Sequence, residues 1–138
     1  MLTFSTLALT LALSTQVSAK DFPDKPYSLK TKGTTTQVKK GVQGKFALQI
    51  IPAKGFKVSR EAPMKIKLKS DGLTLEKSKL GQKDVINKKG DFSQFNVPFG
   101  TPASGSQSVA ANAVFFICNE NICQRKVEKL EVAVNVKP

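Results

Sequence analysis

The chain lacks histidine and tryptophan, and its 138 residues include only one tyrosine and two cysteines. Without histidine, the Ser-His and Cys-His pairs that activate nucleophiles cannot form, and the commonest zinc ligand is missing. Two cysteines without histidine make a poor metal site, so we expect no metal and no cofactor. Only 2 of the 22 basic residues are arginine. Together with the lack of tryptophan, this argues against nucleic acid as a partner, because bidentate base contacts and base stacking need these side chains.

Acidic residues are also scarce: 10 stand against 22 basic ones, which gives a net charge of +12. The lysines are spread along the chain, as at Lys39-Lys40, Lys65/Lys67/Lys69 and Lys88-Lys89. One interpretation is a solvated lysine coat that keeps a small β protein soluble and protects its sheet edges. The other is a surface for anionic partners, for example an adhesin that binds anionic surface polymers. The even spread favours the coat.

Long hydrophobic runs are absent as well. Residues 1–19 contain no charged side chain, with an apolar stretch at Leu7–Leu13 and small residues at Val17-Ser18-Ala19. This pattern predicts a signal peptide over residues 1–19, cleaved before Lys20. A retained membrane anchor would need about 18–20 apolar residues. We therefore expect an exported protein, periplasmic or secreted, that does not span the membrane once processed.

Alternation of apolar and polar residues predicts β-strands through the rest of the chain. Apolar positions with a period of two occur at 46–50, 64–68, 73–75, 92–99, 114–118 and 130–136, separated by Pro-, Gly- and Asp-rich turns. Short strands at this spacing, without an amphipathic helix, indicate an all-β, immunoglobulin-like antiparallel β-sandwich. We expect this single domain over residues 44–138. Residues 20–43 are polar and predict a partly flexible segment, with a weak edge strand around Tyr27–Lys30.

Both cysteines lie in the stretch FFICNENICQRK, residues 115–126. The residues between them, Asn119–Ile122, suit a four-residue hairpin loop built around a type I turn. Cys118 and Cys123 would then face each other at its base, where Cα atoms of opposed residues are about 4.5–5.5 Å apart. A disulfide accepts that separation. Outside the cytoplasm such a bond can form and persist.

The residues alone leave open whether this pair is a structural bridge or a working dithiol. Closing a loop of about six residues removes only about 2 kcal/mol of unfolded-chain entropy, whereas a bridge across about 65 residues would remove more than about 4 kcal/mol. Arg125 and Lys126 follow Cys123 and would favour the thiolate. Glu120 lies inside the loop, where it is either a solvated turn residue or a local acid or base.

The segment VFFICNENICQRKVEKLEVAVNV resembles the closing hairpin of the N-terminal periplasmic domain of the DsbD-type thiol:disulfide interchange proteins. Upstream, GFKVSREAPMKIKLKSDGLTL resembles a further segment of that domain, so the resemblance covers residues 54–138 by pattern. It implies an immunoglobulin-like sandwich with a redox-active pair, Cys118 and Cys123. The best-known members have one more residue between the cysteines. They also have an aromatic cap loop, for which Phe92, Phe95 and Phe99 are the candidates here.

By this resemblance, we expect thiol:disulfide interchange with periplasmic or membrane redox proteins, in which Cys118 and Cys123 are the catalytic residues. Neither a transmembrane segment nor a thioredoxin-like domain follows them, so a separate protein would supply the electrons. The alternative is a non-enzymatic binding or accessory module of the cell envelope, in which the hairpin disulfide is structural.

Overall fold

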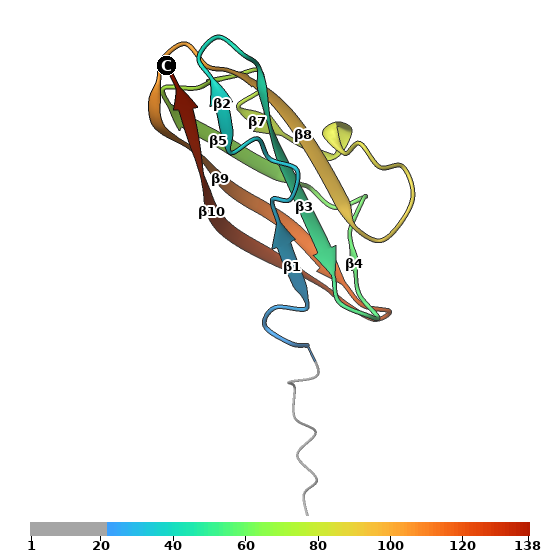
Figure 1. The fold of residues 1–138 in the computed structure, drawn as a ribbon. Helices are drawn as coiled ribbons and strands as arrows, with labels where there is room; N and C mark the ends of the chain where they lie inside the picture. The colour runs from blue at the N-terminus through green and yellow to red at the C-terminus, as the bar shows by residue number, and fades with distance from the viewer. Residues whose placement is uncertain (1–21) are drawn as a thin grey trace, which may run out of the picture.

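A computed structural model describes residues 22–138 as two β-sheets packed face to face (Figure 1). The predicted signal peptide lies outside the described residues. The four-stranded sheet contains, in spatial order, β1 (Tyr27–Lys30), β3 (Gly44–Pro52), β8 (Ser93–Gly100) and β6 (Thr74–Leu75). The six-stranded sheet contains β2 (Gln37–Lys39), β10 (Cys123–Lys137), β9 (Gly105–Cys118), β5 (Lys65–Asp71) and β7 (Lys79–Leu80), with β4 (Lys57–Val58) paired to β9. A short 3-10 helix, η1 (Gln82–Asp84), follows β7.

The order of the strands is that of an immunoglobulin-like sandwich. In one sheet, the first long strand of the chain, β3, lies between β1 and β8, and β6 lies on the far side of β8; this matches the A-B-E-D order of that fold. In the other sheet, β5, β9 and β10 follow the C-F-G order. The pairs are antiparallel except that β2 runs parallel to β10. The predicted fold class is confirmed.

The core forms where the two inner faces meet. Strand β5 buries Ile66 and Leu68 and exposes the lysines between them, as the alternation predicts. Strand β8 buries Phe95, Val97 and Phe99. Phe92 falls out of phase because it precedes the strand, and Ser93 takes the inward position instead. Such period-two burial is what one covered face and one solvated face produce.

The segment before residue 44 contributes a strand to each sheet. The expected edge strand is present, since β1 pairs with β3 and opposes Leu29 to Ile50. Strand β2 was not expected, because its three residues hold a single apolar side chain, Val38. That side chain is buried, and β2 pairs with the end of β10. The sandwich therefore draws on chain N-terminal to the expected boundary at residue 44.

The two longest strands, β9 and β10, form a hairpin that runs the length of the molecule (Figure 1). Its closed end, with both cysteines, lies at the end of the sandwich opposite to the C-terminus and beside β4. Within residues 22–138, no helix has the length and hydropathy that a bilayer crossing requires.

Candidate functional site

A disulfide joins Cys118, the last residue of β9, to Cys123, the first of β10. The two residues are directly opposed in the ladder, with Cα atoms 4.0 Å apart. Their pairing continues without interruption down to Val136 opposite Gly105. The predicted hairpin and the predicted partnership of the two cysteines are both present.

The loop Asn119–Ile122 is held by one side chain. The Asn119 Oδ1 atom accepts hydrogen bonds from the backbone N–H groups of Asn121 and Ile122, each at 2.8 Å. The Asn119 N–H donates to the Ile122 carbonyl at 2.9 Å. An Asn side chain that bonds to backbone two residues ahead is a common device for closing short turns. Glu120 lies exposed at the tip, in the position of a solvated turn residue.

The two cysteines differ in exposure. Cys118 is 3% exposed, because β4 pairs along its strand and places Lys57 opposite to it. Cys123 begins the outer strand of the hairpin and is exposed. Both line a groove of about 300 Å³, together with Lys57, Ser59, Arg60 and Asp91. A reagent in that groove would therefore meet the sulfur of Cys123 more readily than that of Cys118.

The disulfide lies on the outer face of its sheet. Phe115 and Ile117 are buried in the core, so the alternate residue Cys118 points to the other side. The cations near the bridge divide between the two faces for the same reason. Arg125 is two residues from Cys123 and shares its face, whereas Lys126 lies on the opposite one. The Lys126 Nζ atom donates to the Asp24 carbonyl at 2.8 Å and lies 5.7 Å from the centre of the Phe22 ring.

Arg60 also lines the groove, but its guanidinium group is engaged. It donates to the carbonyl oxygens of Asn87, Gly90 and Phe92 at 2.9, 3.1 and 3.0 Å. These contacts hold residues 87–92 against β4, and the Val58 N–H adds a bond to the Asp91 carbonyl at 2.9 Å. Arg60 therefore shapes the wall of the groove. No local sequence pattern indicates this role, since the partners are 27 to 32 residues away.

The aromatic residues proposed as a cap lie elsewhere. Phe95 and Phe99 are buried in the core, while Phe92 is partly buried and lines a separate hollow with Phe56. Phe56 instead lines a neighbouring pocket, together with Cys118, Asn119 and Glu120. Its ring packs edge-to-face against Phe22, with centroids 5.2 Å apart. Sequence reasoning missed Phe56, because it stands alone in a turn between β3 and β4.

The segment before β1 and β1 itself are fastened to the same hairpin. The Tyr27 ring packs edge-to-face on Phe115 at 5.0 Å, and its hydroxyl donates to the Glu128 carboxylate. Burial raises the pKa of Tyr27 well above its ordinary value, and the hydrogen bond and negative charge of Glu128 raise it further. Lys25 adds an ion pair with Glu128 at 3.5 Å. The hairpin is thus supported on its inner side by residues from the start of the domain.

Comparison with protein-family models and with curated proteins finds no match. Among solved structures, similar chains include a conjugative transposon lipoprotein from Bacteroides eggerthii, at 10% identity and TM-score 0.46, covering 80% of this chain and 97% of that one. A lipoprotein from Bacteroides thetaiotaomicron has 16% identity and TM-score 0.47, covering 83% and 82%. Domains 4 and 5 of the S-layer protein SbsC have 19% identity and TM-score 0.46, covering 80% and 51%. At such low similarity, the comparison assigns neither family nor function.

Proposed function

We propose that the protein is an exported, non-enzymatic binding or accessory module of the cell envelope, with a structural disulfide at the end of its longest hairpin. The observation that carries the proposal is the position of the bridge. Cys118 and Cys123 are opposed in a ladder that extends to Gly105 and Val136, so the bond closes a hairpin that is already paired. The predicted signal peptide supports export, and a disulfide fits an oxidising compartment.

The surroundings of the bridge also support a structural role. Arg60, which lines the groove, is committed to three backbone carbonyls, and Lys126 contacts the N-terminal segment instead of the sulfurs. Cys118 is covered by β4. A buried thiol is a poor nucleophile, because burial disfavours the thiolate that attack on a disulfide requires.

The reduction potential of the pair tests this proposal. The purified protein is equilibrated with glutathione or thioredoxin redox buffers, and the fraction oxidised is measured by thiol alkylation. A structural bridge should have a potential below about −300 mV. A potential in the range of exchange proteins, about −120 to −270 mV, would contradict the structural role.

Thiol:disulfide exchange is the second candidate, and the shared groove favours it. Both cysteines line one open groove, with Lys57 and Arg125 on the same face of the sheet. The bond could open without disturbing the core, because it lies on the outer face. By this proposal, the protein acts as the N-terminal domain of the DsbD-type interchange proteins does, with separate redox proteins as electron donor and acceptor.

In that reaction, the thiolate of the exposed Cys123 attacks a partner disulfide, forms a mixed disulfide and releases one partner thiolate. Cys118 then attacks Cys123 in the mixed disulfide, which re-forms the internal bond and releases the reduced partner. Two electrons pass to the partner, and a protein dithiol must re-reduce the pair. If exchange occurs, Cys118→Ser should trap a mixed disulfide through Cys123, whereas Cys123→Ser should trap little. Equal trapping by both variants, or none, would contradict this assignment.

A further inference from the structure

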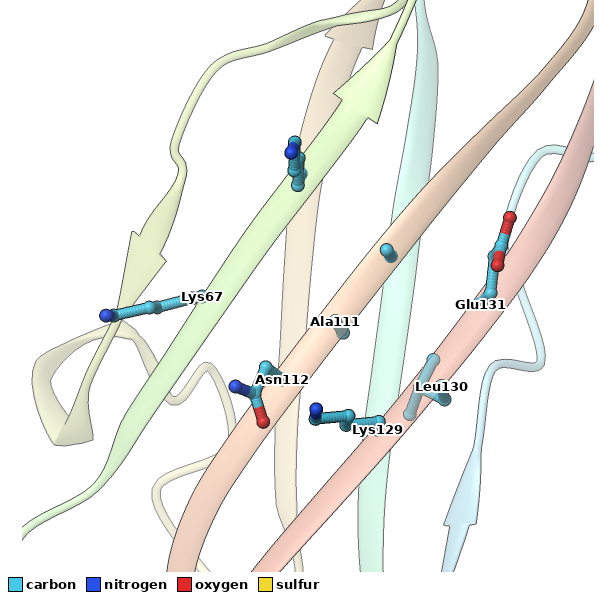
Figure 2. A pocket seen from close by; sticks show the side chains of 8 residues that line it. Lys67, Ala111, Asn112, Lys129, Leu130 and Glu131 are labelled. Carbon is cyan, nitrogen blue, oxygen red and sulfur yellow. The ribbon is translucent and has the colours of Figure 1, made fainter.

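We infer that the outer face of the six-stranded sheet binds an extended, carboxylate-bearing polysaccharide, in a groove centred on Asn112. The inference rests on the proposed function as a binding module and gives it a partner. The groove has a volume of about 580 Å³ and runs over β5, β9 and β10 (Figure 2). Its lining includes Lys67, Lys69, Ala110, Asn112, Lys129 and Glu131.

Three lysines and one asparagine form a single row across four neighbouring strands. Lys79 on β7 opposes Lys67 on β5, Lys67 opposes Asn112 on β9, and Asn112 opposes Lys129 on β10. Like charges directly opposite each other on paired strands are destabilising. Among the described residues, the ion pairs are Lys25–Glu128 and Lys77–Asp84, so no lysine of this row forms an ion pair. A bound anion would relieve the repulsion.

The cations stand on two sides of β9. Lys65, Lys67 and Lys69 follow one another on the exposed face of β5, about 6.8 Å apart because alternate strand residues share a face. Arg125 and Lys129 are exposed on β10. The two columns are separated by two strand spacings, about 9.6 Å. Glu131, opposite Ala110, also lines this groove, and Asp71 follows Lys69 on the exposed face of β5.

Asn112 in the floor of the groove has a polar atom without a partner. Its Oδ1 atom is buried and accepts no hydrogen bond from the described residues. Lys129 extends from β10 towards Asn112, whereas Lys67 extends from β5 away from Asn112 (Figure 2). A buried acceptor left unpaired is costly and uncommon in folded proteins. A ligand hydroxyl that reached the groove floor would satisfy it.

Apolar side chains continue the floor towards the disulfide. Val114 and Phe116 lie on the outer face of β9, and both are only partly buried. Val127 opposes Val114 and is 49% exposed. The groove therefore combines cationic walls, an amide and an apolar floor. These features match the carboxylates, the hydroxyls and the C–H faces of an acidic sugar chain.

Other polyanions match this face less well. An acidic peptide docks on a sheet chiefly through backbone hydrogen bonds at an edge strand. Strand β9 offers no such edge here, because it is paired with β5 on one side and with β10 on the other. Nucleic acid would use aromatic stacking and arginine forks, and the outward positions of β5, β9 and β10 hold one residue of each kind, Phe116 and Arg125.

The test uses polygalacturonate as the probe, with dextran, polyglutamate and single-stranded DNA of similar length for comparison. Binding is measured with the purified protein by calorimetry, and the side-chain amide signal of Asn112 is followed by NMR. Polygalacturonate should bind, should shift the Asn112 signal and should lose affinity between about 50 and about 300 mM salt. The double variant K67Q/K129Q should bind about tenfold more weakly. The matched control, K30Q/K45Q, removes two exposed lysines from the other sheet and should bind normally.

Three results would overturn the inference: equal weakening in both double variants, polyglutamate or DNA binding as tight as polygalacturonate, or no binding of polygalacturonate at low salt. Asn112→Ala adds an independent measurement, because it keeps the charge and removes only the amide. It should weaken binding by several-fold, and unchanged affinity would exclude the hydroxyl contact. None of these results depends on the reduction potential, so the inference and the proposed function can fail separately.

Discussion

At the scale of a single residue, Tyr27 stabilises the fold through its hydroxyl. This group donates a hydrogen bond to Glu128, which lies 101 positions further along the chain. Replacing Tyr27 with Phe keeps the ring contact with Phe115 and leaves the carboxylate without this donor. We expect the free energy of unfolding to fall by about 1–2 kcal/mol. Chemical denaturation measures the loss. Leu29→Ala, in the same strand, should also destabilise the protein, but it should not alter how the stability depends on pH.

The raised pKa of Tyr27 also makes the stability of the protein depend on pH. Above about pH 10, the tyrosine of the unfolded chain ionises while the folded one stays protonated, so the unfolded state gains stability. The contribution is therefore complete below about pH 10 and declines as the pH rises further. Wild-type stability should fall between about pH 9.5 and 11 more steeply than that of Tyr27→Phe. Parallel curves for the two proteins would contradict the assignment.

Arg60 orders the loop beside the disulfide through three carbonyl contacts. Lysine keeps the charge but cannot span three separated acceptors, because its three N–H donors all lie on one nitrogen, whereas Arg60 uses two. Arg60→Lys should therefore cost about 1–2 kcal/mol and increase hydrogen exchange in residues 87–92. The control is Arg125→Lys, an exposed position where little change is expected. If residues 87–92 exchange at the wild-type rate in Arg60→Lys, the loop is held by other contacts.

The β9–β10 hairpin is the element on which the candidate site depends. Because its ladder is paired from the loop to Gly105, the disulfide should add little beyond the closure of a short loop. Cys118→Ser/Cys123→Ser should lower the free energy of unfolding by about 2 kcal/mol and leave the circular dichroism spectrum unchanged. Reduced wild-type protein should behave in the same way. Loss of the sheet signal in either case would mean that the bridge supports the whole sandwich.

The longer strands could be predicted from the sequence, whereas the short ones could not. Strands β3, β5, β8, β9 and β10 contain enough alternating residues for a period of two to appear. Strands β2, β4 and β7 have two or three residues each. They exist because neighbouring strands offer free backbone groups, a cause that lies outside their own sequence. Strand β4 matters most for the site, since it covers Cys118 and forms the groove.

At the scale of the whole molecule, the positive charge is concentrated where the strands bring lysines into rows. The net charge of +12 should make the fold repel itself at low ionic strength. We expect the melting temperature to rise between about 20 and about 300 mM salt, as screening shortens the range of the repulsion. The variant K67Q/K79Q removes one opposed pair, so it should be more stable at low salt and respond less to added salt. The control K30Q/K45Q should keep more of the salt response.

The sequence by itself determined the strand periodicity, the sandwich class and the hairpin that opposes Cys118 to Cys123. These features are local, because alternation and turn residues act over a few positions. Only the tertiary structure decided which face of β9 is covered. Both faces of β9 are apolar, with Ala113 and Phe115 on one side and Val114 and Phe116 on the other. The residue pattern of β9 therefore does not indicate which of its faces packs against the second sheet. The register of strands distant in sequence likewise placed Lys79, Lys67, Asn112 and Lys129 in one row.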